Sequence, residues 1–396
     1  MRSRRSFLSP VAILVTELLF ASPVAAGGLT VDGLVTAGAE ISLAGPKVEL
    51  GGVRLTLQFE QPFSSGALRA RVEVDRSIRL REAFLDIYLE DTDLRLGRQR
   101  IPWGTADISN PTDNLNPVDY THPFAEENRL EVLALRAQHY WGDWTAEFVW
   151  IPFFVPSPQP EPGSRWYVPV PLPPGFSLGA PQEPAKELNN SEFALKLSRM
   201  GGKADFSLSY FDGWDDLPSL HPDLDSMTIV PVYHRLRVLG ADFATASGKW
   251  GFRGEAAYFL TEDRERTDPA IKNPYLQVVL GADFTPSDAY YFNGAVAVEH
   301  VAKSAVSLKG GPLEEGTTST LMLTAEYRPR FELTCGLDCI YNLTGRDFLL
   351  RPRLSYSPAD GVTFSTGLLL FHGPAGTRFG NFAEKDYLYA GVEMAF

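Results

Sequence analysis

Glu82-Ala83-Phe84-Leu85-Asp86-Ile87-Tyr88-Leu89-Glu90 alternates between apolar side chains at the odd positions and mostly polar ones at the even positions. This period of two is typical of a β-strand that has one apolar and one polar face. The same alternation appears in four further stretches, residues 54–60, 68–75, 192–198 and 331–338. Because we find no comparable 3.6-residue period anywhere in the chain, the sequence predicts an all-β protein.

The alternating segments are long, about 10–14 residues, which is the length of a tilted strand that crosses a bilayer. A soluble β-sandwich or solenoid would alternate in the same way, but its strands usually have about 5–6 residues. An unpaired strand edge in hydrocarbon leaves polar backbone groups without partners, so a spanning sheet has to close on itself. The expected fold is therefore a transmembrane antiparallel up-and-down β-barrel.

Turn residues divide the chain into about 18 strands, or 16 if the first two segments or the long segment 227–246 are misread. Short Gly, Pro, Asp and Ser turns alternate with longer connections, as in barrels with short periplasmic turns and long outer loops. Both chain ends then lie on the short-turn side. The expected strand cores are 29–44, 48–60, 67–77, 80–90, 93–101, 129–141, 143–153, 191–200, 203–212, 227–246, 249–261, 275–285, 289–302, 317–328, 331–343, 346–357, 361–372 and 385–396.

The two ends of the chain carry export signals. Residues 1–26 combine a basic head, an apolar stretch and a small-residue cleavage site, which is the layout of a secretory signal peptide. The barrel is then expected over residues 27–396. The last segment alternates and ends on an aromatic, with Gly391, Met394 and Phe396 in a pattern similar to the C-terminal strand that the barrel-assembly machinery of Gram-negative bacteria reads. The expected location is the outer membrane, in contact with its lipid.

Composition excludes several other classes. A formal net charge of −13 disfavours a nucleic-acid binder, which needs a basic face. After the N-terminus there is no apolar run of the roughly 18–20 residues that a spanning helix requires. Cys335 and Cys339 are the only cysteines. In one strand their Cα atoms would lie about 13 Å apart, too far for a disulfide. We interpret them as two small apolar residues on one face.

Polar side chains on the inward face predict a lumen lined by both charge signs. About 18 strands enclose a space too wide for side chains alone to fill, and opposed charges in a wet constriction filter solutes by charge. The alternative, that these charges pair and brace the wall, is compatible with a pore. The pore-lining candidates are Arg54, Arg69, Arg71, Glu73, Glu82, Asp86, Arg95, Arg253, Glu255, Arg351 and Arg353.

Two long loops, residues 102–127 and 154–190, are candidates to narrow the lumen. The first carries the constriction candidates Trp103, Asp107, Asp113 and Asp119. Its Asp and Asn oxygens suit Ca²⁺, but Asn and Asp beside Pro are first of all turn chemistry, so we expect no metal and no cofactor. The second holds ten of the 30 prolines, which favour extended chain. It either covers the mouth or stands outside in solvent.

Two regions carry a family resemblance. Residues 94–104, followed by Asn116-Pro117-Val118-Asp119-Tyr120, and residues 237–243, followed by 254–258, resemble motifs of porin-like outer-membrane families of Gram-negative bacteria. These include alginate-export-type barrels and a large group of uncharacterised porin-like proteins. The resemblance implies a barrel with a porin-like role, but it does not identify a substrate.

We therefore predict a channel for passive or weakly selective diffusion of small hydrophilic solutes. The main alternative is a barrel that sheathes a partner protein or exports a polymer with it; a homo-oligomer is also compatible with the sequence. An enzyme is not expected, because the six histidines are scattered and no Gly-x-Ser-x-Gly motif is present.

Overall fold

The computed structural model describes residues 28–45, 48–106, 109–125, 128–304 and 316–396. The predicted signal peptide lies outside these residues. The regular structure in them consists of strands and two short 3₁₀ turns, η1 (Leu188–Asn190) and η2 (Gly380–Phe382). None of their helices is long and apolar enough to span a membrane. The strands are β1 Thr30–Ser42, β2 Val48–Phe63, β3 Gly66–Val74, β4 Ile78–Tyr88, β5 Thr92–Gln99, β6 Val132–Trp141, β7 Trp144–Ile151, β8 Ser177–Leu178, β9 Glu192–Arg199, β10 Asp205–Trp214, β11 Ser219–Asp223, β12 Thr228–Val232, β13 Arg235–Ser247, β14 Trp250–Leu260, β15 Tyr275–Ser287, β16 Tyr290–Val301, β17 Gly316–Arg330, β18 Leu333–Asn342, β19 Asp347–Ala359, β20 Val362–His372 and β21 Tyr387–Ala395.

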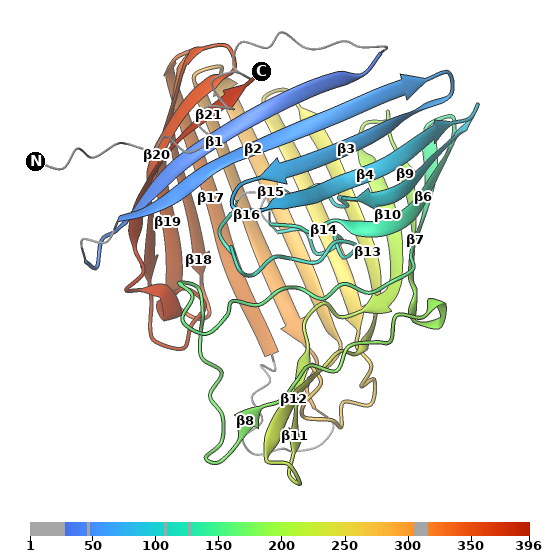
Figure 1. Ribbon diagram of the computed structural model, residues 1–396, viewed down its shortest axis with the longest axis vertical. Helices are drawn as coiled ribbons and strands as arrows, with labels where there is room; N and C mark the ends of the chain where they lie inside the picture. The colour runs from blue at the N-terminus through green and yellow to red at the C-terminus, as the bar shows by residue number, and fades with distance from the viewer. Residues whose placement is uncertain (1–27, 46–47, 107–108, 126–127, 305–315) are drawn as a thin grey trace, which may run out of the picture.

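Eighteen of these strands form one closed antiparallel barrel (Figure 1). Each pairs with its neighbours along the chain, and β1 closes the ring by pairing with β21, from Leu34 opposite Ala395 to Ser42 opposite Tyr387. The predicted fold class and strand number are confirmed. Closure leaves no strand edge unpaired, which is the condition for a sheet in hydrocarbon.

The seam between the chain ends is held by a glycine and the terminal aromatic. The backbones of Gly33 and Phe396 exchange two hydrogen bonds of 2.9 Å. A Cβ atom on Gly33 would lie 2.1 Å from the Phe396 ring, so only glycine leaves room for the ring. Two other residues of the predicted assembly signal, Gly391 and Met394, pair with Gly38 and Val35 of β1.

One predicted strand is wrong in its bounds. Residues 227–246 are divided into β12, which lies outside the barrel, and β13, which belongs to it. Pro231 lies in β12 and has no N–H to donate to a strand ladder, which disfavours a barrel strand there, although the barrel accommodates Pro352 within β19. β12 pairs instead with β11 and β8 in a small sheet that projects beyond the barrel at the lower end of Figure 1.

The connections follow the predicted alternation of short and long. Turns at one rim, such as those between β2 and β3 and between β6 and β7, span only two residues. The opposite rim carries the long connections β5–β6, β7–β9, β10–β13, β14–β15 and β20–β21. The start of β1 and Phe396 both lie at the short-turn rim.

The outer face of the barrel exposes large apolar side chains on neighbouring strands. Leu195, Leu208 and Leu239 are examples, with exposed fractions of 49%, 60% and 50%. Phe193, Leu197 and Leu337 are also exposed. A continuous apolar outer face of this kind is the surface that a bilayer covers.

The inward face differs from the prediction on one half of the barrel, where many apolar side chains lie among buried charged ones such as Glu147, Asp242 and Glu255. The sequence led us to expect a polar inner wall throughout. The core of the protein instead lies inside β6–β14, because the β5–β6 connection folds into the lumen and packs against that wall. This core contains Ile101, Trp103 and Leu115 from the connection and Val132, Ala134, Val149, Ile151, Ala194, Phe211, Leu236, Val238, Ala257 and Phe259 from the wall.

Candidate functional site

The β5–β6 connection narrows the lumen and is fastened to the far wall. We call its described residues, 100–106, 109–125 and 128–131, the inserted segment. The Glu255 carboxylate on β14 accepts hydrogen bonds from the backbone N–H groups of Thr105 at 2.5 Å and Ala106 at 2.7 Å. Thr112 donates to it from both its N–H (3.3 Å) and its hydroxyl (2.9 Å). Glu255, expected to line the pore, therefore also anchors the segment.

Two more anchors fix the start of the inserted segment. The indole N–H of Trp103 donates to Glu147 of β7 at 2.9 Å, and the Trp103 side chain is buried in the core. The Asn116 amide accepts from the Ile101 N–H at 2.7 Å and donates to the Leu130 carbonyl at 2.7 Å, tying the two ends of the segment together. Trp103, predicted as a constriction residue, is therefore a buried anchor of the inserted segment.

The three predicted constriction aspartates have different surroundings. Asp107 lies outside the described residues. Asp119 accepts from the Thr121 N–H at 2.9 Å, which is the turn chemistry anticipated for this stretch. Asp113 is buried, accepts from the Trp103 N–H at 3.4 Å and lies 3.5 Å from Arg129. Within the described ranges, no three His, Cys, Asp or Glu side chains converge to hold a metal ion.

The burial of Asp113 makes the packing of the inserted segment depend on pH. Burial raises the pKa of Asp113 above its ordinary value, and Arg129 offsets this only in part. The folded state therefore binds the proton more tightly than the unpacked state. The stability that this group contributes is fully present below about pH 4, the pKa of a solvated aspartate, and is lost as pH rises through the folded pKa.

We expect Asp113→Asn, which mimics the protonated group, to remove this dependence. The readout is the rate of tryptic cleavage within the inserted segment. The rate for wild type is divided by the rate for the variant, once at pH 5 and once at pH 8. The ratio should rise with pH, and Asp119→Asn in the same segment serves as the matched control. A ratio that stays constant would show that Asp113 does not link the segment to pH.

Seven of the predicted pore-lining residues lie on β2–β5, and six of them form ion pairs. Asp86 bridges Arg69 and Arg95, with its carboxylate 2.6 Å from Arg95 Nε. Glu131, a buried residue of the inserted segment, lies 3.5 Å from Arg71, 3.1 Å from Arg81 and 3.6 Å from Arg98. Glu82 lies 3.6 Å from Arg71, and Glu73 lies 3.6 Å from Arg79. Arg54 is exposed on β2. These charges brace the wall and dock the segment.

A second network lies on β17–β19. Arg351 and Arg353 donate through Nε to Asp338 at 3.0 and 3.1 Å, and Arg353 also reaches Glu326 at 2.6 Å. The remaining predicted residue, Arg253, lies 3.3 Å from Asp283 of β15. The sequence reasoning missed Glu131 and Asp338 as partners. The alternation in residues 331–338 already placed Asp338 on the polar face, so this signal was available.

The long second loop crosses the mouth rather than standing outside. Arg165 contacts Glu40 of β1 at 2.5 Å, and Lys385 donates to the Tyr167 carbonyl at 3.2 Å. Trp166 packs edge-to-face on Phe124 of the inserted segment, with ring centroids 5.0 Å apart. Figure 1 shows this connection running across the barrel opening. Three loops therefore meet inside the long-loop rim, around a second apolar cluster that includes Leu349, Leu369, Phe371, Phe379 and Tyr387.

Two cavities remain between these loops and the opposite wall. The arginine cavity, about 510 Å³, is lined by Arg351 and Arg353 of β19, Arg378 of the β20–β21 loop and Phe124 of the inserted segment, among others. The threonine cavity, about 580 Å³, is lined by wall residues of β15–β18 and again by Arg378. Arg378 thus lines both cavities. Both cavities lie against strands of the wall from β15 to β20.

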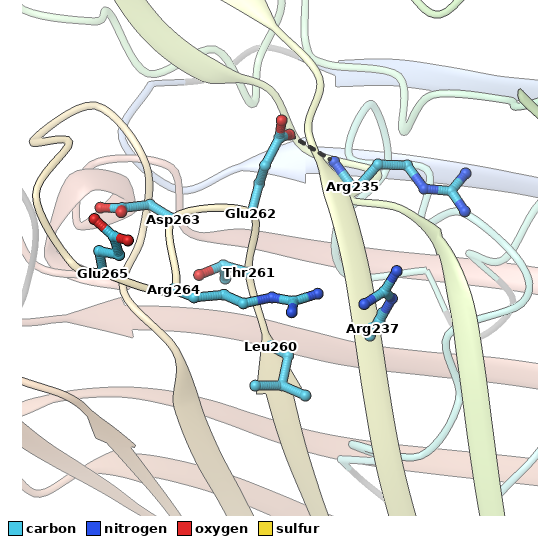
Figure 2. A pocket seen from close by; sticks show the side chains of 8 residues that line it. All are labelled: Arg235, Arg237, Leu260, Thr261, Glu262, Asp263, Arg264 and Glu265. Atoms are coloured by element: carbon cyan, nitrogen blue, oxygen red, sulfur yellow. Dashed lines mark hydrogen bonds between the residues drawn. The ribbon is translucent and has the colours of Figure 1, made fainter.

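A third cavity lies at the long-loop rim. This rim cavity, about 470 Å³, is formed where β13 begins and β14 ends, and its residues are drawn in Figure 2. Glu262 accepts a hydrogen bond of 3.0 Å from the Arg235 backbone N–H, the dashed line in the figure. Three arginines face three carboxylates here, so the lining has no net charge. The lining residues are Arg235, Arg237, Leu260, Thr261, Glu262, Asp263, Arg264 and Glu265.

Comparison with solved structures supports the fold. OccK5 (OpdH) of Pseudomonas aeruginosa aligns with a TM-score of 0.53 and 9% identity, covering 94% of this chain and 99% of that one. OmpT, an outer-membrane protein of Vibrio cholerae, aligns with a TM-score of 0.45 and 10% identity, covering 95% and 100%. A mutant porin of Rh. blastica aligns with a TM-score of 0.45 and 12% identity, covering 93% and 100%. At 9% identity, the alignment with OccK5 shows a shared barrel fold and nothing more.

A search of curated proteins finds no match. The family comparison gives a match to the DUF1302 family, described as a protein of unknown function, over residues 58–327. The predicted resemblance to porin-like barrels is thereby confirmed at the level of fold and of an uncharacterised family. Because the match covers more than half of the sequence, the chain belongs to the DUF1302 family.

Proposed function

We propose that this protein is an outer-membrane channel through which small hydrophilic solutes diffuse along a lumen narrowed by the inserted segment. One observation carries the proposal. The segment is fastened to β7 and β14 on one half of a closed barrel, while two polar cavities stay open beside the other half. A barrel whose interior is partly filled and partly wet conducts solutes up to the width of the gap.

The membrane location rests on the outer face and on the seam. Exposed apolar side chains surround the barrel, and the terminal Phe396 completes β21 where it meets β1. We propose a Gram-negative outer membrane as the location and the barrel-assembly machinery as the partner that reads β21. The proposed role requires no catalytic residue, metal or cofactor.

The alternative role, a sheath around a partner protein, is less well supported. Loops of this chain already occupy the lumen, and Trp166, Phe124 and Phe371 pack together inside the mouth. A partner threaded through the barrel would have to displace these contacts.

Liposome swelling tests the proposed function. Purified protein, refolded in detergent and reconstituted, should admit arabinose and glucose, with rates that fall steeply from glucose to the tetrasaccharide stachyose. The control is the same protein reconstituted after heat denaturation. If liposomes with correctly folded barrel take up none of these sugars, the channel proposal is wrong.

A further inference from the structure

The arginine cavity has an unusual charge for this chain. Among its lining residues, Arg351, Arg353 and Arg378 face a single carboxylate, Asp338. The protein as a whole carries a formal charge of −13, and the rim cavity of Figure 2 is balanced. The arginine cavity is therefore a positive site within an acidic protein.

Arg378 differs from the other two arginines because it forms no short ion pair with the barrel wall. Arg351 and Arg353 donate to Asp338. Arg378 comes from the β20–β21 loop and is accessible to solvent. Within the described ranges it forms no hydrogen bond and no short ion pair, and Asp347 and Tyr120 attract its guanidinium only at longer range. Its guanidinium lies 5.2 Å from the centre of the Phe379 ring. A guanidinium presents a planar fork of donors that matches a carboxylate.

The same cavity also has an apolar side. Leu349 and Leu369 of the wall, Phe379 of the β20–β21 loop and Phe124 of the inserted segment all line it. These residues belong to the second apolar cluster, which is held in place by ring contacts such as Phe124 on Phe371 at 4.9 Å. A preformed pocket with one charged group and an apolar wall is suited to a ligand that has both features.

The geometry points to a binding site in the arginine cavity for amphipathic organic monoanions, with the carboxylate on Arg378 and an aliphatic or aromatic tail along Leu349, Leu369 and Phe124. This inference rests on the proposed channel function and specifies its preferred solute class. Solutes of this kind would bind on the path between the arginine and threonine cavities, which both contain Arg378. Small neutral solutes would pass without binding.

Current block in planar bilayers tests the site, with octanoate as the probe. Octanoate should reduce the unitary current at concentrations where acetate has no effect. The half-blocking concentration should fall by up to about fourfold per added methylene from butyrate to octanoate, the gain expected for burying a CH₂ group. Octylammonium, with the same tail and the opposite charge, should block more weakly.

Arg378→Gln should raise the half-blocking concentration of octanoate about tenfold or more, because a charge-assisted pair is lost. Arg378→Lys, which keeps the positive charge, should retain part of the octanoate block seen in wild type. The matched control is Arg264→Gln, which removes the same charge from the rim cavity of Figure 2 and should leave the block unchanged. The inference is overturned if a conducting channel shows no octanoate block, or if both Gln variants change it equally. Absence of any current would instead contradict the channel itself.

Discussion

Glu255→Ala should widen the channel and make its current noisy. The Glu255 carboxylate accepts hydrogen bonds from Thr105, Ala106 and Thr112, all in the inserted segment. A hydrogen bond to a charged group is worth about 1.5–3 kcal/mol, so removing the shared acceptor should weaken the docking by about 2–4 kcal/mol. The segment would then spend time detached from β14.

Single-channel recording measures this effect. We expect a higher mean unitary conductance than in wild type, with frequent transitions between levels, and faster tryptic cleavage within the segment. Glu262→Gln changes a carboxylate at the rim that contacts Arg235 and not the segment, and should leave both readouts unchanged. A Glu255→Ala channel with wild-type conductance and cleavage rate would show that the anchor is dispensable.

Gly33→Leu should prevent most of the protein from closing into a barrel. A Cβ atom at Gly33 would lie 2.1–2.5 Å from three atoms of the Phe396 ring, closer than real contacts allow. Overpacking commonly costs about 1–3 kcal/mol, and here it falls on the last pairing that closes the sheet. The folded fraction can be read from the heat-dependent shift in gel mobility that is typical of stable barrels.

A second substitution, Phe396→Ala, distinguishes a steric clash at Gly33 from a general defect in the strand. Phe396→Ala alone should lower the folded yield because the ring no longer covers Gly33. In the Gly33→Leu background it should partly restore folding, which gives a double-mutant coupling. Gly294→Ala in β16 is the control, because an added methyl there meets nothing closer than 3.4 Å. Equal losses in single and double variants would contradict the packing account.

The barrel itself could be predicted from the sequence because period-two alternation recurs in five stretches spread along the chain. Strand length then distinguishes a membrane barrel from a soluble sheet. The prediction was wrong at residues 227–246, where β12 and β13 join through Tyr233 and His234 without a turn signal. Pro231 was a weak signal, since proline is rare in central strands but Pro352 lies within β19 of the barrel.

The interior was less predictable, because alternation tells which side chains share a face but not what fills the lumen. Trp103 and Asp113 were identified from their place in the loop, and Glu255 from the inward face. That Glu255 accepts the backbone N–H groups of Thr105 and Ala106 depends on contacts about 150 residues apart in the chain. Arg378 was missed because a single arginine in a long connection shows no sequence pattern.

The account depends most on an open path beside the inserted segment. The unitary conductance of refolded wild-type protein in a planar bilayer at 1 M KCl tests this directly. We predict discrete ohmic steps, smaller than those of the Glu255→Ala variant under the same conditions. Protein that shows the heat-dependent mobility of a folded barrel and yet gives no steps in either form would contradict the account.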